Sequence, residues 1–288
     1  MYFTIKALSK VICLLPAALR SLAASAIGRI CWLAVPGRRK QMAVSNVIQS
    51  GLAADEHAAA AIVQESVYRF GPMMTEVLCF PKLTRDKVKS MVTVEGAEHL
   101  EAALAHGKGA VLATAHSGNW ELLGAALALL DFPLVAVVQK QTSAGADQFI
   151  NEYRTMAGMH VTYKSSVLEM ARLLAEGKII GLLMDQDAHA DGLPVPFFGR
   201  MASTPQGPAA LARMKGAPIV PAFITRKADG THTVIIHPPL WTAKSTNREQ
   251  DLLAVTIKLN AIIESHVRAY PSEWFWLHNR WKTKYQQM

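Results

Sequence analysis

A histidine and a glutamate five residues apart, His116 and Glu121, are the residues of this chain best suited to acid–base chemistry. In a regular α-helix this spacing would leave the two side chains about 140° apart, so they meet only across a turn. Ser117, Gly118 and Asn119 supply turn-forming residues and an N-cap, which places Glu121 in a first helical turn, where the helix dipole favours its ionised form. We therefore expect His116 to act as a general base on a hydroxyl, with Glu121 orienting the imidazole.

Two other readings of this segment stay open. Ser117 is an alternative nucleophile, but the surrounding Ala-His-Ser-Gly-Asn does not match the G-x-S-x-G turn that exposes such a serine. A lone histidine is often a core residue satisfied by a neighbour. At His116 a strand end, a turn and an acidic helix start coincide, and this coincidence favours chemistry.

A second acidic segment, Asp185-Gln186-Asp187, offers a D-x-D site of the kind that metal-dependent glycosyltransferases use. It does not match a calcium loop, because Ala190 stands at the sixth position and Pro196 at the twelfth. The alternatives are that Asp185 or Asp187 bonds substrate hydroxyls, pairs with an arginine of the site, or only caps a strand end. We expect a substrate-binding role and no metal.

Short apolar runs bounded by turn residues must position these groups. Four of them predict buried strands, at residues 110–115, 134–138, 179–184 and 219–224, and a fifth run at 233–236 predicts an edge strand. Ala- and Leu-rich helical stretches alternate with them, so the fold class is α/β, with a mostly parallel central sheet flanked by helices. Ligands bind outside the carboxyl ends of such strands. The polar residues that follow the four runs are therefore expected to converge on one site: His116; Gln139 and Lys140; Asp185, Gln186 and Asp187; Thr225 and Arg226.

The first 40 residues are apolar and basic, with no Asp or Glu before Asp55. Pro16, Arg20 and Arg29 interrupt the apolar stretch 11–35, and an arginine at the bilayer centre costs about 2.5–3.5 kcal/mol. A helix lying on the membrane, with its arginines at anionic lipid phosphates, avoids that cost. A single tilted span and a buried core helix are the alternatives. We expect residues 1–40 to form an N-terminal hydrophobic membrane-associating helix and residues 41–288 one catalytic domain, whose stretch 41–80 forms two helices.

The composition narrows the class of partner. The chain has 288 residues, 51% of them hydrophobic, and a net charge of +8, which favours acidic partners such as anionic lipids, phosphorylated substrates or acidic proteins. No recognised nucleic-acid reader motif accompanies the charge, so we expect no nucleic-acid partner. Cys13, Cys31 and Cys79 are scattered and indicate neither a metal site nor a disulfide framework.

The block His-Ser-Gly-Asn-Trp-Glu at 116–121 resembles the catalytic block of the bacterial lipid A late acyltransferases, a branch of the lysophospholipid acyltransferase superfamily. The resemblance covers about residues 38–282, and further segments follow in the family's order: 185–187, 195–200, 202–205, 207–212, 216–221 and 276–282. The combination is far more specific than any one segment.

This resemblance implies a transferase that moves a fatty acyl chain from an acyl carrier protein thioester to a hydroxyl of a phosphorylated, glucosamine-based lipid A precursor. It implies no cofactor beyond that thioester co-substrate, and a place at the cytoplasmic face of the inner membrane. A lysophospholipid or a phosphatidylinositol mannoside is an alternative acceptor. A metal-dependent membrane glycosyltransferase and a non-catalytic basic membrane-binding module are the alternatives from other classes.

The same resemblance assigns Arg154 to the thioester oxyanion or to a phosphate, the alternative being a surface salt bridge near Glu152. Arg200 beside Phe197 and Phe198 suits a phosphate adjoining an acyl tail, although the aromatics also suit a loop anchor. The expected substrate-binding residues are Asn119, Arg154, Asp185, Asp187 and Arg200. We also expect a helix that starts with Thr204 as N-cap and Pro205 at its first position. The aromatic stretch 271–281 fits an interfacial belt or an element that closes the core.

Overall fold

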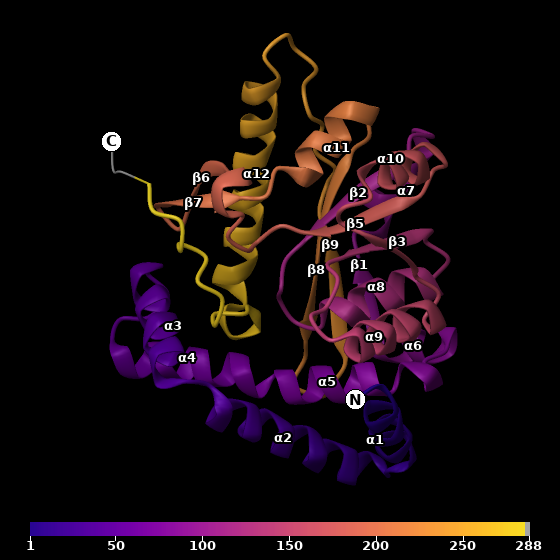
Figure 1. The fold of residues 1–288 in the computed structure, drawn as a ribbon, viewed down its shortest axis with the longest axis vertical. Helices are drawn as coiled ribbons and strands as arrows, with labels where there is room; N and C mark the ends of the chain where they lie inside the picture. The colour runs from indigo at the N-terminus through magenta and orange to yellow at the C-terminus, as the bar shows by residue number, and fades with distance from the viewer. Residues whose placement is uncertain (286–288) are drawn as a thin grey trace.

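A computed structural model, which describes residues 1–285, has a seven-stranded sheet in the order β1-β9-β8-β2-β5-β3-β4 (Figure 1). Strands β8, β2, β5, β3 and β4 are parallel, β9 is antiparallel to β8, and β1 is parallel to β9. The mostly parallel α/β class is confirmed. The strands are β1 (Val92–Glu95), β2 (Ala110–Thr114), β3 (Leu134–Val138), β4 (His160–Tyr163), β5 (Ile179–Leu183), β8 (Ile219–Arg226) and β9 (His232–Ile236).

All five predicted strands form, within two residues of their expected ends. The last of them, β9, is not the edge strand that we expected, because β1 pairs with its outer side. Every residue of β2 is buried, since this strand is in the middle of the sheet with helices on both faces. Its side chains alternate between two cores, with Val111 and Ala113 in one and Ala110 and Leu112 in the other.

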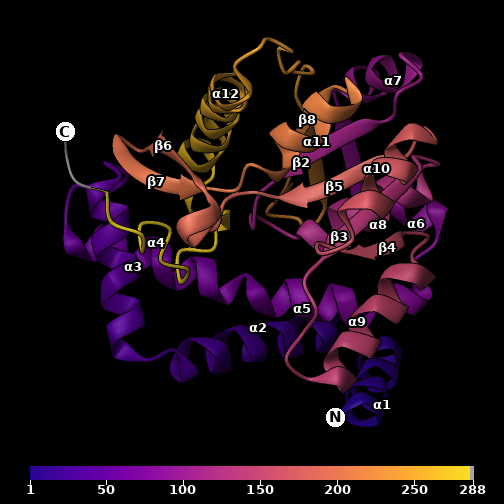
Figure 2. The ribbon, with the colours of Figure 1, turned by 45° about the horizontal axis from the view of Figure 1, so that its top comes forward.

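Helices cover both faces of the sheet (Figures 1 and 2). The core that contains Val111 draws on α10, α11 and α12, and the core that contains Leu112 draws on α5, α7, α8 and α9. These helices are α5 (Phe70–Leu78), α7 (Ala97–Ala105), α8 (Trp120–Leu129), α9 (Ala144–Met156), α10 (Val167–Ala175), α11 (Gly207–Lys215) and α12 (Arg248–Ala269). Short α6 (Arg85–Met91) precedes β1.

The remaining N-terminal helices form a layer beneath the sheet (Figure 1): α1 (Tyr2–Leu14), α2 (Ala17–Ala34), α3 (Gly37–Gln49) and α4 (Glu56–Tyr68). Glycines allow α2 to cross closely over α4 and α5, because a Cβ at Gly71 would lie 1.9 Å from the carbonyl oxygen of Ala24. Where two helices were expected between residues 41 and 80, there are three. Gly71 and Pro72 do not end a helix but lie in the first turn of α5, where proline is tolerated.

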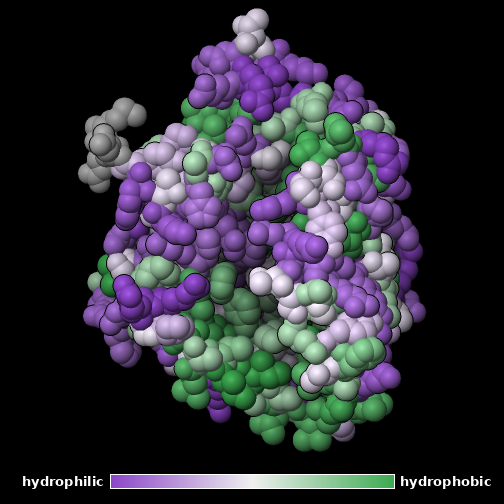
Figure 3. Space-filling model, in the orientation of Figure 1, coloured by the Kyte–Doolittle hydropathy of each residue, from purple (hydrophilic) through white to green (hydrophobic). Residues whose placement is uncertain are grey.

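Helix α2 is the one helix within residues 1–285 that is long and apolar enough to cross a membrane. Only 11% of it is buried, which disfavours the reading as a buried core helix. Its exposed apolar side chains continue those of α1, and Figure 3 shows hydrophobic surface gathered at this end of the molecule. The most exposed of them are Phe3, Leu14, Leu22, Ile30 and Leu33. Both the surface-lying helix and the tilted span agree with this apolar face.

A second, two-stranded sheet lies beside α12 (Figure 2) and pairs β6 (Leu193–Phe197) with β7 (Arg200–Thr204). The prediction of a helix that starts at Thr204 and Pro205 is wrong. Thr204 ends β7 opposite Leu193, and α11 begins at Gly207 with Pro208 in its first turn. The rule about proline at a helix start holds, but at the second of two prolines.

Candidate active site

A cavity of about 1410 Å³ opens at the carboxyl ends of β2, β3 and β5. Its polar lining includes His116, Glu121, Arg154, Asp187 and His278. Its apolar lining includes Val138, Phe149, Ile150, Met170 and Leu182. Figure 3 shows this face of the molecule hollowed between a hydrophilic and a more hydrophobic part. The lining thus combines groups for acid–base chemistry with apolar surface that suits a hydrocarbon chain.

His116 is held by a carboxylate from the neighbouring strand. Its Nδ1 lies 2.8 Å from Oδ1 of Asp185, and its backbone N–H donates to Oδ2 at 2.9 Å. The indole of Trp274 also donates to Oδ2, at 2.7 Å. Because the carboxylate accepts from Nδ1–H, the neutral ring has its free lone pair on Nε2. The His116 side chain is 20% exposed and lines the cavity, so Nε2 is the nitrogen available as a base.

Asp185 is an ionised carboxylate in a closed environment. Burial by itself would raise the pKa of Asp185, but the charge of the His116 imidazolium and the hydrogen bonds from His116 and Trp274 hold that pKa below its usual range. The aspartate therefore stabilises a positive charge on His116 and fixes its tautomer, as the acid of a catalytic triad does. It does not face the cavity as a substrate ligand, since both of its oxygens are already engaged.

The expected contact between His116 and Glu121 does not form; Asp185 takes that place. Helix α8 begins at Trp120 and directs Glu121 toward α9, where its carboxylate accepts two hydrogen bonds from Arg154. Nε of Arg154 lies 2.8 Å from Oε2, and Nη2 lies 2.6 Å from Oε1. This bidentate pair is mostly buried, with 13% of the Arg154 side chain and 10% of the Glu121 side chain exposed. Glu121 is thus in the cavity as expected, but in contact with the arginine and not with the imidazole.

Arg154 is not a surface salt bridge with its neighbour Glu152. Glu152 pairs instead with Lys6 and Tyr2 of α1. Arg154 lines the cavity and donates to Asn151 in addition to Glu121. The structure therefore brings four of the predicted residues to this cavity: His116, Glu121, Arg154 and Asp187.

Asn119 and Asp187, two of the predicted substrate-binding residues, have hydrogen-bond partners within the protein. Asn119 caps α8 by accepting from the Leu122 N–H, and its Nδ2 donates to Glu76, on the side of the loop away from the cavity. The Asp187 carboxylate accepts from the backbone N–H of His189 and from both the N–H and the hydroxyl of Thr283.

Arg200 does not line the cavity. Its guanidinium donates to Asn46 and Gln49 of α3 and to Ser50, which caps that helix, and stacks over the ring of Trp281 at 3.4 Å. Phe197 and Phe198 are buried in the core, where they anchor the hairpin. Arg200 ties β7 to α3, and we do not carry it into the proposed site.

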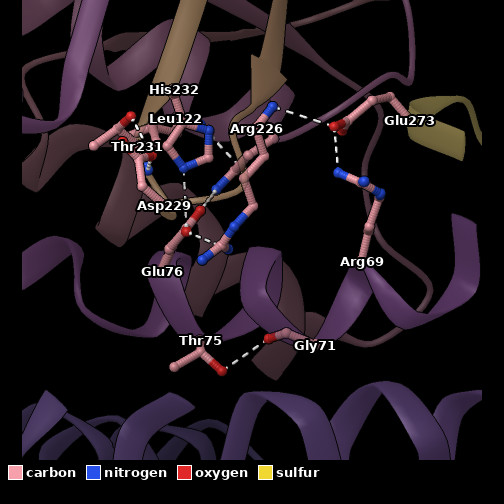
Figure 4. A network of polar contacts seen from close by, with 11 residues as sticks. Arg69, Gly71, Thr75, Glu76, Leu122, Arg226, Asp229, Thr231, His232 and Glu273 are labelled. Atoms are coloured by element: carbon pink, nitrogen blue, oxygen red, sulfur yellow. Dashed lines mark hydrogen bonds and ion pairs between the residues drawn. The ribbon is translucent and has the colours of Figure 1, made fainter. Parts of the chain in front are cut away.

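A polar network adjoins the loop at residues 116–119, and Figure 4 shows its members Glu76, Arg226, His232, Glu273 and Arg69. Glu76 of α5 accepts from Asn119, from Arg226 at the end of β8 and from His232 of β9. Glu273 pairs with Arg69 and accepts from the Arg226 N–H. The Glu76 carboxylate therefore fastens the loop to the sheet, and Glu273, whose backbone carbonyl accepts from the Gly118 N–H, links it to Arg69.

Ser117 and Gly118 complete this support. Ser117 is 2% exposed, and its hydroxyl lies 3.1 Å from Nε2 of the buried His266, so it is not presented to the cavity as a nucleophile. Gly118 has a φ of +60°, and a Cβ there would lie 2.1 Å from the carbonyl oxygen of Ile224. Only glycine permits this turn against β8.

No group of three or more metal-ligating side chains occurs in the part of the chain that the structure describes. Asp185 and Asp187 have their oxygens occupied by protein donors, as described above. The two carboxylates of the D-x-D segment therefore bond protein donors and are not free to act as a pair of metal ligands.

Comparison with known proteins identifies the family of the chain. Residues 1–283 match the family model for bacterial lipid A biosynthesis acyltransferases. The chain belongs to this family. It is an acyltransferase related both to lipid A enzymes and to enzymes that act on phosphatidylinositol mannosides.

Two curated relatives and one solved structure illustrate the range. The chain is 27% identical over 225 residues to the phosphatidylinositol mannoside acyltransferase of Mycolicibacterium smegmatis, covering 76% of this chain and 72% of that protein. It is 24% identical over 200 residues to the lipid A biosynthesis palmitoleoyltransferase of Escherichia coli, covering 69% and 64%. The crystal structure of the 1-acyl-sn-glycerophosphate acyltransferase PlsC from Thermotoga maritima has a TM-score of 0.41 at 14% identity, covering 95% of this chain and 99% of that one. At that score the structural likeness adds nothing to the assignment.

Proposed function

We propose that this acyltransferase moves a fatty acyl chain from an acyl carrier protein thioester to a hydroxyl of a phosphorylated glycolipid, with a lipid A precursor as the first candidate acceptor. The observation that carries the proposal is the imidazole of His116, oriented by a buried carboxylate and open on Nε2 to a cavity with apolar walls. The thioester is a co-substrate, and no cofactor takes part.

The chemistry runs through a tetrahedral intermediate. Nε2 of His116 takes the proton of the acceptor hydroxyl while the hydroxyl oxygen forms a bond to the carbonyl carbon of the thioester. Asp185 stabilises the imidazolium that forms. The π electron pair of the carbonyl moves to the carbonyl oxygen. When this pair reforms the C=O bond, the C–S bond breaks, and the leaving thiolate takes the proton from the imidazolium. Arg154, which is paired with Glu121 and nearly buried, supplies positive charge to this space.

A phosphatidylinositol mannoside is the second candidate acceptor. Relatives that bear this activity in their names match the chain at 27–28% identity over about three quarters of its length. Both acceptors present a free hydroxyl on an anionic lipid, so the same base serves either.

The expected site of action is the cytoplasmic face of the inner membrane, with α1 and α2 against anionic lipids. The exposed apolar side chains of these helices and the absence of Asp and Glu before Asp55 support this placement. Leu22→Asp together with Leu33→Asp should reduce binding to vesicles that contain phosphatidylglycerol, because both side chains are more than half exposed on α2. Unchanged binding would contradict the placement.

The activity is tested by incubating the purified chain with labelled acyl carrier protein thioesters and each acceptor separately, with mass analysis of the products. A product one acyl group heavier is expected with one acceptor and is expected to be absent in His116→Ala. Acyl transfer to neither acceptor, or full activity in His116→Ala, would contradict the proposal. Activity that requires a nucleotide sugar and is lost with a chelator would favour the glycosyltransferase alternative.

A further inference from the structure

A second imidazole, that of His278, lines the same cavity as His116. The segment 274–278, which contains His278, is fastened to the loop at residues 116–119, because the backbone N–H of Phe275 donates to the carbonyl oxygen of His116 at 2.9 Å. Trp274 of the same segment donates to Asp185. His278 is therefore held in a fixed relation to the base.

The tautomer of His278 follows from one hydrogen bond. The backbone N–H of Asp187 donates to Nε2 of His278 at 2.9 Å, so Nε2 carries a lone pair and the neutral ring carries its proton on Nδ1. Burial lowers the pKa of His278, which keeps the ring neutral at physiological pH. Nδ1 has no hydrogen-bond partner among residues 1–285, and the side chain is only partly buried.

Of the histidines that line the cavity, His116 and His278 thus have opposite tautomers. Asp185 leaves His116 with an acceptor nitrogen, and two residues later Asp187 leaves His278 with a donor N–H. One acidic segment therefore prepares one ring to take a proton and the other to give a hydrogen bond. From the sequence we expect the D-x-D segment to contact the substrate directly. In the structure, Asp185 and Asp187 instead bond the imidazoles of His116 and His278.

We propose that Nδ1–H of His278 donates a hydrogen bond to the carbonyl oxygen of the acyl thioester and strengthens it as that oxygen becomes negative. This inference rests on the proposed acyl transfer. His278 keeps its proton throughout the step: the hydroxyl proton goes to His116, the carbonyl electron pair goes to oxygen, and on collapse the thiolate leaves with the proton. A neutral N–H suits this role because it offers a donor and no competing base.

Two amide variants separate this role from a purely structural one. In His278→Asn the amide nitrogen falls near the position of Nδ1, which preserves the donor and loses the acceptor for Asp187. In His278→Gln the amide oxygen falls near Nε2, which preserves the anchor and loses the donor. The proposal predicts that His278→Gln lowers kcat about 10²–10³-fold, as expected for loss of one oxyanion donor, with little change in the KM of the acceptor. His278→Asn is expected to stay within about tenfold of the wild type.

The opposite ranking, with His278→Gln active and His278→Asn inactive, would overturn the proposal in favour of an anchor for Asp187. Equal losses in the two variants, or wild-type kcat in both, would also overturn it. Thermal unfolding of each variant shows whether the fold is retained. His116→Ala is measured beside them: if it keeps full activity, the proposed acyl-transfer mechanism itself fails, whereas an inactive His116→Ala with a fully active His278→Gln refutes only the role of His278.

Discussion

Two carboxylates flank the cavity, one at the end of β5 and one at the start of α8, and they do different things. Asp185 is 3% exposed and holds His116 through both its side-chain oxygens, Oδ1 on the imidazole Nδ1 and Oδ2 on the backbone N–H. Glu121 is only five residues from His116 in the chain, yet it contacts Arg154. Strand pairing explains the difference, because Thr114 of β2 lies opposite Leu183 of β5, and His116 and Asp185 each follow two residues later. Register across a sheet, more than distance along the chain, selects the partner of the base.

The largest effect on kcat should come from replacing His116 itself. His116→Gln removes the base that either carboxylate is supposed to serve, so kcat should fall about 10²–10⁴-fold. The measurement is single-turnover acyl transfer with a fixed acceptor. Vesicle binding should be unchanged, because α1 and α2 are untouched; a loss of binding equal to the loss of rate would point to misfolding.

Asp185→Asn should come next, with kcat lower by about 10²–10³-fold. Its amide can turn an N–H toward Nδ1, which favours the wrong tautomer of His116 and removes the base. Steady-state kinetics beside Glu121→Gln decides the comparison directly. A larger loss in Glu121→Gln than in Asp185→Asn would reverse our assignment.

Stability against pH gives an independent measure of Asp185. Its pKa in the folded protein is lowered, so the stabilisation that it provides is complete above its unfolded pKa of about 3.9 and is lost as the pH falls through the lower folded value. The free energy of unfolding of the wild type should therefore exceed that of Asp185→Asn at pH 5, which lies about one unit above 3.9. The gap should shrink in denaturant titrations at more acidic pH; a gap that grows there would contradict the lowered pKa.

Glu121→Gln should have a smaller effect, about tenfold on kcat, because it frees Arg154 without touching the imidazole. Glu152→Gln is a matched control, since it also removes a carboxylate from a cationic partner but faces Lys6 on α1. The control should keep wild-type kcat. Equal losses in both variants would show that the Glu121–Arg154 pair is no more than structural.

The smallest effect on kcat is expected at Glu76, which supports the loop at residues 116–119 through Asn119. Glu76→Gln weakens the contacts to Asn119, Arg226 and His232, so the free energy of unfolding should fall by about 1–3 kcal/mol. Turnover in the folded fraction should change by no more than about threefold, a shift below 1 kcal/mol. Chemical denaturation and kinetics on the same samples test this, and a loss of kcat as large as that of Asp185→Asn would place Glu76 among the residues that orient the base.

Much of the fold was predictable because its signals are local. The runs that became β2, β3, β5, β8 and β9 are short and apolar, and Asn119 and Glu121 have the types that begin a helix. The β6–β7 hairpin was missed, since Pro194 and Pro196 argue against a strand and are tolerated here only in an isolated two-stranded sheet. The convergence of His116, Gln139, Gln186 and Asp187 at the strand ends was also predictable, whereas Arg226, expected with them, pairs with Glu76 outside the cavity. Which of them touch was not, because the order of β2 and β5 in the sheet results from packing, and His278 meets Asp187 across 91 positions of chain.

The most direct test of the central claim is the nitrogen NMR spectrum of His116 in the wild type, Asp185→Asn and Glu121→Gln. We predict a neutral ring protonated on Nδ1 in the wild type and in Glu121→Gln, with that tautomer lost or mixed in Asp185→Asn. A tautomer that changes in Glu121→Gln and persists in Asp185→Asn would contradict the claim that Asp185 holds the base.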